Sequence, residues 1–318
     1  MCSIQEDNQL HLERFKYIQP HPSYIAGFID GDGCIFIRKI KDGYQSGITI
    51  AQSRTNILQV IKYHFGGSIT TTTSRNSNKN DDEITKNTKR NQFNYVVRSN
   101  QYSLLLNYIK YNIILKQNQI KCLYDFSKLC NKLNKDDEKD EIYKMCSSFN
   151  NKTTTPEENS FDFSRLNIMY IAGLFDSEGC IYINKNNYNK FYVKITQKNN
   201  PIILHKIKEY FGYGNIYDNN CFKIENKKCC IDFIEKVKPY LIVKYNQANL
   251  FIKFSNTIEK NIKDICYHNC NKEKHEVEEF YDVNSHEIGK DGYSNCINIK
   301  HKHNNMLREL NIYHINKE

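Results

Sequence analysis

The sequence contains no tryptophan, and arginine supplies only eight of its 45 basic residues. Asparagine, lysine, isoleucine and tyrosine are abundant instead, a bias typical of coding in an AT-rich genome. No stretch approaches the ~20 consecutive apolar residues that a membrane-spanning helix needs. The sequence therefore predicts a soluble protein without a membrane partner.

Disulfide bonds are not expected, although the chain has 12 cysteines. No N-terminal hydrophobic signal segment precedes them, and Cys34 and Cys180 sit inside apolar, strand-like runs. A reducing compartment is the better interpretation. We expect an intracellular location, in the compartment that holds the AT-rich genome: an organelle, or a virus-infected or microbial cell.

Length and charge set the first positive expectations. A chain of 318 residues is long enough for two domains that each bury a core. The formal charge is +9, from 45 Lys and Arg against 36 Asp and Glu. This excess favours a polyanionic partner such as nucleic acid.

An internal repeat organises the chain. The segment YIAGFIDGDGCIFI at 24–37 matches YIAGLFDSEGCIYI at 170–183 in nine of 14 positions. The sequences that follow repeat as well, and the matching positions are Gln52 and Gln197, Gly66 and Gly212, Lys116 and Lys244. Each half therefore predicts a helix, two strands, a helix, two strands and two helices.

Periodicity supports these elements. Apolar and polar residues alternate in the runs 34–40 and 191–197, which predicts strands with one buried face. Apolar residues at three-and-four spacing predict helices that contain Ile57, Ile61 and Phe65 in the first half, with the equivalent helix around 203–211 in the second.

Spacing defines the domain boundaries. Asp32 and Lys116 are 84 residues apart, whereas Glu178 and Lys244 are 66 apart, so the first half carries 18 extra residues. They fall in the polar range 70–92, which predicts an extended turn between two strands. We divide the chain into a first repeat at 1–131, a polar linker at 132–163, a second repeat at 164–258 and a C-terminal extension at 259–318.

The C-terminal extension contains several cysteines and histidines, among them Cys266, His268 and Cys270. Their spacing forms neither a CxxC pair nor a familiar zinc finger. We therefore do not expect zinc there, and we favour a small DNA-binding or stabilising extension.

Each repeated motif ends in two carboxylates spaced i to i+2, followed by a glycine and a strand-like run. The second carboxylate, Asp32 or Glu178, therefore falls where a helix stops. An anion at that position costs up to ~1 kcal/mol, because a helix C-terminus carries negative partial charge. A bound divalent cation would offset this cost.

Small residues in the motifs predict how the two helices meet. Ala26-Gly27 and Ala172-Gly173 would let the helix backbones approach closely and bring the two acids side by side. Paired carboxylates that accept Mg²⁺ and a phosphate are the components of metal-assisted phosphodiester hydrolysis. The alternative is that the acids only cap turns whose glycines adopt positive φ angles. Repetition of the acid with the same neighbours favours the catalytic interpretation.

The nonamers IAGFIDGDG at 25–33 and IAGLFDSEG at 171–179 resemble the LAGLIDADG motif of homing endonucleases, in the monomeric form that has two motifs. The resemblance covers roughly residues 20–130 and 165–258. It implies an α+β fold in which two pseudo-symmetric αββαββα repeats form an antiparallel β-saddle along the DNA major groove. The two motif helices are expected to pack at the interface between the repeats.

The resemblance also implies roles for individual residues. Asp32 and Glu178 would hold the metal, Mg²⁺ or another divalent cation, with help from the backbone carbonyls of Gly31 and Ser177. Lys116 and Lys244 match family lysines near the scissile phosphates. Gln52 and Gln197 match positions that contact the water around the metals. Six further motif residues are expected to have structural roles: Gly27, Asp30, Gly33, Gly173, Asp176 and Gly179.

The pocket departs from the family pattern at two positions, since Asn56 and Pro201 stand where the family often has a basic residue. Base recognition would come from strand side chains. The candidates are Arg38, Lys39, Gln45, Thr49, Asn184, Lys185, Tyr192 and Lys194, and the sequence does not fix which alternate face points outward.

The function implied is site-specific cleavage of double-stranded DNA by a monomer, at a long target that is not palindromic. Two alternatives remain open within the same fold. The chain could be a splicing maturase whose partner is intron RNA, or a DNA-binding protein that does not cleave. The intact acids and lysines in both halves favour cleavage.

Overall fold

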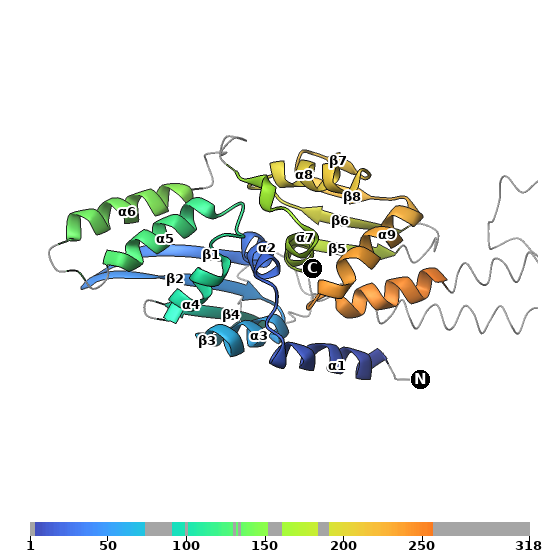
Figure 1. Cartoon of the computed structure of the whole chain (residues 1–318), viewed down its shortest axis with the longest axis horizontal. Helices are drawn as coiled ribbons and strands as arrows, with labels where there is room; N and C mark the ends of the chain where they lie inside the picture. Colours follow the sequence, from blue (N-terminus) through green and yellow to red (C-terminus); the bar gives the residue numbers. More distant parts are fainter. Residues whose placement is uncertain are drawn as a thin grey trace, which may run out of the picture.

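The computed structural model describes residues 4–73, 91–98, 101–129, 132, 135–151, 161–183 and 191–256. The fold is α+β, with two four-stranded antiparallel sheets and helices packed against them (Figure 1). Among the described residues, no helix has the length and apolar character that crossing a membrane requires. The helices are α1 (Ile4–Tyr17), α2 (Pro22–Asp32), α3 (Asn56–Phe65), α4 (Tyr102–Ile109), α5 (Gln117–Leu129), α6 (Asp136–Phe149), α7 (Ile168–Glu178), α8 (Ile202–Phe211) and α9 (Lys227–Val237), with 3-10 turns η3 (Phe163–Arg165) and η4 (Lys238–Tyr240) and further helix at 245–256.

The two sheets have the same topology. The first is ordered β1-β2-β4-β3 and the second β5-β6-β8-β7. Their strands are β1 (Gly33–Ile40), β2 (Gly43–Gln52), β3 (Ser68–Thr73), β4 (Asn91–Arg98), β5 (Gly179–Ile183), β6 (Phe191–Thr196), β7 (Asn215–Tyr217) and β8 (Cys221–Ile224). The predicted order of elements in each repeat is therefore confirmed. Part of the predicted turn at 70–92 belongs to β3 and β4, and its remainder lies outside the described residues.

Hydrophobic periodicity explains why these segments pack as they do. In β1, Ile35 and Ile37 are buried, whereas Cys34 and Arg38 on either side of them are exposed and Phe36 between them is half-buried. In α3, Ile57, Ile61 and Phe65 all face the core, and the helix stops at Gly66. The alternation of strands and the three-and-four spacing of helices thus place one face of every element inward.

The motif helices α2 and α7 pack against each other at the centre of the molecule, between the two sheets (Figure 1). A β-carbon on Gly27 would lie 2.1 Å from the carbonyl oxygen of Tyr170, and one on Gly173 would lie 2.0 Å from that of Tyr24. The two backbones therefore touch where each motif has its central glycine. This contact was predicted from the Ala-Gly pairs, and its symmetry reflects the sequence repeat.

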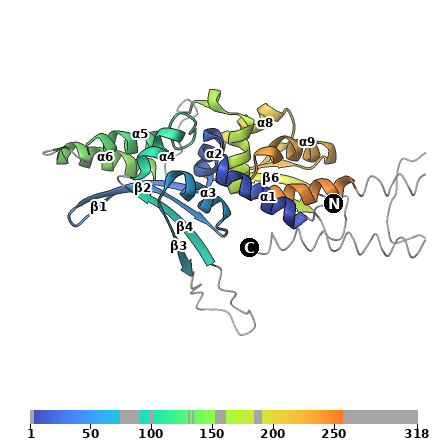
Figure 2. The ribbon, with the colours of Figure 1, turned by 60° about the horizontal axis from the view of Figure 1, so that its bottom comes forward.

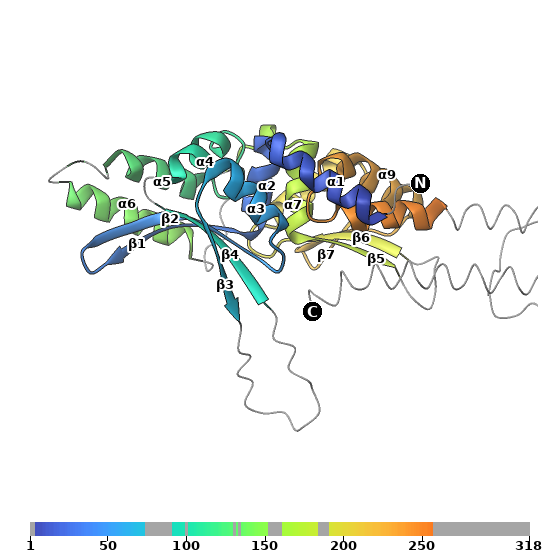
Figure 3. The ribbon, with the colours of Figure 1, turned by 90° about the horizontal axis from the view of Figure 1, so that it is seen from below.

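Most helices gather on one side of the sheets, as Figure 3 shows from below. In Figure 2 the β3–β4 pair extends away from the helices. The inward face of each sheet carries the apolar residues of the core, and the outward face carries the more exposed alternate residues. Among the described residues, the two outward faces are the sides of the sheets that the core does not use.

The range predicted as a polar linker contains helix α6. α6 lies along β1, the edge strand of the first sheet, and Asn150 Nδ2 donates to the Ile35 carbonyl at 2.9 Å. Cys146 of α6 is fully buried, and Ile142 and Tyr143 pack on the core. A helix that covers an edge strand protects its open backbone from pairing with another chain. The polar composition of the range concealed this narrow apolar stripe.

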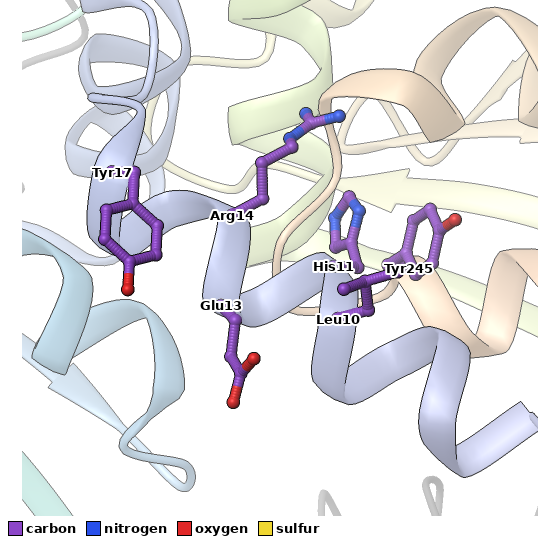
Figure 4. Close-up of a pocket in the computed structure, with 6 residues that line it drawn as sticks. All are labelled: Leu10, His11, Glu13, Arg14, Tyr17 and Tyr245. Carbon is purple, nitrogen blue, oxygen red and sulfur yellow. The ribbon is translucent and has the colours of Figure 1, made fainter.

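Helix α1 connects the two repeats on the helical side. The His11 ring stacks on Tyr245 with centroids 3.5 Å apart, and its Nε2 lies 2.6 Å from the Leu241 carbonyl oxygen. Toward the first repeat, His64 Nε2 lies 2.8 Å from the Phe15 carbonyl oxygen. Figure 4 shows the shallow pocket beside this stack, which α1 and Tyr245 line. None of its residues belongs to a motif helix.

Candidate active site

The two predicted catalytic acids end the two motif helices. Asp32 is the last residue of α2 and Glu178 the last of α7, and both are partly exposed. A β-carbon on Gly31 would lie 2.0 Å from Ser177 Oγ and 3.1 Å from Glu178 Cγ. The Glu178 side chain therefore packs against the backbone that precedes Asp32. The helix contact brings one acid from each repeat to the same place.

The glycines after the acids do not adopt the left-handed conformation. Gly33 has φ −82° and Gly179 has φ −83°, values open to any residue. A β-carbon would instead lie 2.6 Å from the Ile29 carbonyl at position 33 and 2.4 Å from the Phe175 carbonyl at position 179. The proposed alternative of positive-φ turns is therefore wrong. Glycine is needed because the strand leaves the helix end without room for a side chain.

The first acid of each motif is buried and fully engaged with the protein. Asp30 accepts hydrogen bonds from the backbone N–H groups of Ile114, Leu115 and Lys116 at 2.8–2.9 Å. Asp176 accepts the equivalent bonds from residues 242–244 at 2.7–2.9 Å. Each carboxylate thereby fixes the loop that delivers a lysine to the site. Neither is placed to act on a ligand.

A tyrosine from the opposite repeat completes each of these carboxylate sites. Tyr170 OH donates to Asp30 at 2.7 Å, and Tyr24 OH donates to Asp176 at 2.7 Å. Burial and the neighbouring carboxylate raise the pKa of both tyrosines well above the usual value. Burial also raises the pKa of Asp30, and the charge of Lys116 and the hydrogen bonds oppose that shift. The two repeats are therefore joined by reciprocal tyrosine to aspartate bonds beside the site.

We expect Tyr170→Phe and Tyr24→Phe each to lower the free energy of unfolding by about 1.5–3 kcal/mol, the range for a hydrogen bond to a charged group. Each change removes only a hydroxyl, so a buried carboxylate loses one of its four donors. Urea unfolding measures the effect. Tyr63→Phe is the matched control, because Tyr63 is 67% exposed. Stabilities of all three variants equal to wild type would contradict the structural role of the cross-repeat bonds.

The two predicted lysines lie behind the helix ends. Lys116 Nζ donates to the carbonyl oxygens of Ile29, Asp30 and Gly31 at 2.8, 2.6 and 3.3 Å. Lys244 Nζ donates to the carbonyl of Asp176. Each ammonium thus neutralises the negative end of a motif helix. It offsets part of the electrostatic cost of the acid there, a role that the sequence analysis gave to a bound cation alone.

The surroundings of Lys116 act on its charge in two opposing ways. Burial lowers the pKa of Lys116, and the nearby charges of Asp30, Asp32 and Glu178 counteract it. The charges of both predicted catalytic acids therefore act on this ammonium. Its hydrogen bonds point toward the protein, which suits a residue that holds the helix end in place and sets the local potential.

The two predicted glutamines differ in their contacts. Gln52, at the end of β2, donates from Nε2 to Asp32 Oδ2. Gln197, just after β6, accepts from the backbone N–H of Asn199 at 3.3 Å. Both side chains are buried. Gln52 therefore orients Asp32, a predicted catalytic acid, whereas Gln197 bonds to the turn that follows β6.

The carboxylate oxygens of Asp32 and Glu178 suit a hard divalent cation whose remaining ligands come from water and substrate. The described residues contain no group of three or more His, Cys, Asp or Glu side chains that could hold a metal ion. Asp32 and Glu178 instead offer carboxylate oxygens at two partly exposed helix ends that pack together. Mg²⁺ is held in this way, through one or two carboxylates, with water and substrate phosphates completing its shell. The predicted zinc-free extension lies outside the described residues.

Strand register decides which predicted DNA contacts share the outward face. Arg38 pairs with Gln45, and Cys34 pairs with Thr49, so these side chains point away from the helices. Tyr192 and Lys194 do the same in the second sheet. Lys39 is corrected: it lies on the inward parity of β1 and forms an ion pair with Asp140 of α6 at 3.0 Å. Asn184 and Lys185 lie outside the described residues.

Sequence reasoning missed the two cross-repeat tyrosines, although a signal was present. Tyr24 and Tyr170 occupy the same position of both motifs and are identical. It also missed Tyr182 and Lys223, which register places on the outward face of the second sheet. No periodic feature distinguishes those two from other exposed strand residues.

Comparison with known proteins identifies the class of fold. No family model matches the sequence, and no curated protein matches it either. Solved structures with this arrangement include LAGLIDADG homing endonucleases. The chain has the fold of that class, as predicted.

Three solved structures illustrate the likeness. I-AabMI bound to uncleaved DNA has a TM-score of 0.55 and 17% identity, over 76% of this chain and 92% of its own. I-GzeII in complex with its DNA target has a TM-score of 0.55 and 19% identity, over 80% and 99%. I-SmaMI bound to uncleaveable DNA has a TM-score of 0.56 and 17% identity, over 82% and 99%.

Proposed function

We propose that this chain is a site-specific endonuclease that hydrolyses phosphodiester bonds of double-stranded DNA with a divalent metal ion. The observation that carries the proposal is the convergence of Asp32 and Glu178 at the contact of two pseudo-symmetric helices. Each repeat supplies one acid, one lysine behind it and one sheet beside it. A duplex has two strands to cut, and two equivalent half-sites match that requirement.

The protein groups around the acids serve to position them. Gln52 donates to Asp32 and so fixes the orientation of its carboxylate. Lys116 caps the carbonyls of α2, which lowers the electrostatic cost of an anion at the helix end. When bound, the metal ion supplies a Lewis acid for the phosphate and makes water more acidic. Few other protein groups are then needed for hydrolysis.

The outward faces of the sheets would receive the duplex. An antiparallel ribbon fits the major groove, where each base pair shows a distinct set of donors and acceptors. The formal charge of +9 supports binding to a polyanion. I-AabMI and I-GzeII, which share the fold, were solved on DNA, and I-SmaMI was solved on an uncleaved target in the presence of calcium ions.

The target is proposed to be long and asymmetric, and the active protein to be a monomer. One chain already contains both acids, so a second copy is not needed to complete the site. The two outward faces carry different residues, for example Arg38 and Gln45 in the first sheet against Tyr192 and Lys194 in the second. A palindrome would present the same bases to both faces and leave this difference unused.

The proposal is tested with supercoiled plasmids that carry either a random insert library or the uninterrupted locus of the chain's own gene. We expect linear product at a single sequence with Mg²⁺, and none with chelator or with Ca²⁺. Restoring Mg²⁺ after chelation should restore cleavage. Sequencing of the ends identifies the site.

Binding of the same locus without cutting, in every metal condition, would contradict the endonuclease proposal and favour a DNA-binding protein that does not cleave. Tight binding of the corresponding intron RNA, again without DNA cleavage, would favour a splicing maturase. Gel shift with the duplex and with the RNA distinguishes these two results.

A further inference from the structure

The outward face of the second sheet carries a row of side chains made of three tyrosine rings and one lysine. Tyr182 and Tyr192 are paired across β5 and β6, and their rings stack with centroids 4.6 Å apart. Lys223 of β8 follows, with Nζ 4.4 Å from the Tyr192 centroid and 5.6 Å from the Tyr217 centroid. The row thus crosses all four strands of the sheet. Stacking between strands holds the rings in place before any ligand binds.

The one cation in this row is already neutralised. Lys223 Nζ lies 2.6 Å from Glu225 Oε1, and Tyr217 OH donates to the other oxygen of Glu225 at 2.7 Å. The Glu225 carboxylate raises the pKa of Lys223 and of Tyr217, and the two partners together lower the pKa of Glu225. A closed ion pair attracts phosphate weakly. The row therefore offers ring surface to a ligand more than it offers charge.

The outward face of the first sheet has a different chemistry. Arg38 Nε donates to Gln45 at 2.7 Å across β1 and β2. On β3 and β4, Asn94 Nδ2 donates to Thr72 Oγ1 at 3.1 Å, beside the exposed Thr70. Guanidinium, amide and hydroxyl groups of this kind recognise bases through hydrogen bonds. No such set occupies the central positions of the described second sheet.

We infer that the two sheets read their half-sites by different means, and that the tyrosine row of the second sheet reads thymine. Thymine is the one base with a methyl group in the major groove, and apolar side chains recognise it by contact with that methyl. The row formed by Tyr182, Tyr192 and Tyr217 supplies such contacts over the width of the sheet. Tyr182 and Tyr217 thereby join Tyr192 as proposed specificity-determining residues. This inference rests on the proposed binding of duplex DNA, and does not require cleavage.

The test compares duplexes that differ only in thymine methyl groups. A binding duplex is first selected from a random-sequence library in Ca²⁺ buffer, so that cleavage plays no part. Thymine is then replaced by uracil in one half of the duplex at a time, which removes methyl groups and leaves base pairing intact. We expect Kd to rise about four-fold for each contacted methyl, in one half only, since burying one such group is worth roughly that factor.

Variants assign the effect to the tyrosine row. In the triple variant Tyr182→Ala, Tyr192→Ala, Tyr217→Ala the uracil penalty should disappear, and in Tyr192→Phe, which keeps the ring, it should remain. Tyr63→Ala, at an exposed position of α3, is the matched control and should keep the wild-type penalty. Unfolding midpoints of all variants verify that they remain folded.

An equal uracil penalty in both halves, or none in either, would overturn the inference. So would a penalty that persists in the triple alanine variant. Failure to enrich any duplex would overturn both this inference and the proposed function. An enriched duplex with no uracil effect would overturn this inference alone, and a uracil effect without cleavage would support it while removing the proposed catalysis.

Discussion

Asp32→Asn and Glu178→Gln are each expected to reduce double-strand cleavage by about 10³-fold or more, comparable to the loss of a main electrostatic group in an active site. Both substitutions keep the shape of the side chain and remove its negative charge. A neutral amide oxygen is a much weaker ligand for a hard divalent cation than a carboxylate is. Single-turnover cleavage of the supercoiled target measures the rate of each strand separately.

The form of the residual product is part of the expectation. Because each repeat supplies one acid, a single variant should leave nicked circles, and the double variant should leave supercoiled plasmid intact. DNA binding in Ca²⁺ should be retained by both single variants. Glu235→Gln, an exposed acid on α9, is the control and should cut normally. Cleavage of both strands at the wild-type rate by either single variant would show that its acid is not catalytic.

The second large effect is expected from Gly27→Ala, which should lower the free energy of unfolding by about 3 kcal/mol, near the upper end for overpacking. The new methyl group would lie 2.1 Å from the carbonyl oxygen of Tyr170. Both partners are backbone, so no side chain can rotate to make room, and α2 must move away from α7. Gly173→Ala should behave alike, because its methyl group would lie 2.0 Å from the Tyr24 carbonyl. Urea unfolding gives the stabilities.

The same change should reduce cleavage more than its loss of stability explains, because separation of the helices separates Asp32 from Glu178. Gly212→Ala provides the control: that glycine has φ +75° and no atom within 4 Å of the added carbon. It should cost about 1 kcal/mol through backbone strain alone and leave cleavage unchanged at temperatures where it is folded. A stable Gly27→Ala variant with normal cleavage would contradict the close contact of the helices.

The general fold was predictable because its signals are local and occur twice. Ile35 and Ile37 alternate with more exposed neighbours, which predicts the buried face of a strand. Ile57, Ile61 and Phe65 follow helical spacing, which predicts the buried face of a helix. The duplicated motif also predicts how the two repeats pack together. Glycine at the same position of both motif helices, Gly27 and Gly173, is expected where the two helix backbones are in close contact. The solved LAGLIDADG homing endonucleases that resemble this chain have the same fold.

The details that the sequence did not yield depend on residues far apart in the chain. Lys39 was grouped with Arg38, but adjacent strand residues point to opposite faces, and Asp140 of α6 pairs with Lys39 from 101 positions away. Helix α6 was predicted to be part of a linker because its composition is polar. Its few buried residues become visible only when the edge of β1 is in place to receive them.

By itself, the sequence determined the number of repeats, the order of their elements and the pair of acids that end the motif helices. Those properties follow from periodicity and internal repetition, which act within a few residues of each position. The tertiary structure alone decided that Asp30 and Asp176 are bonded by tyrosines of the opposite repeat, that Lys116 caps a helix 86 residues earlier, and which strand face is open to a duplex. Such contacts join segments that only packing brings together, so the sequence signals them at most indirectly, as the identical Tyr24 and Tyr170 of the two motifs do.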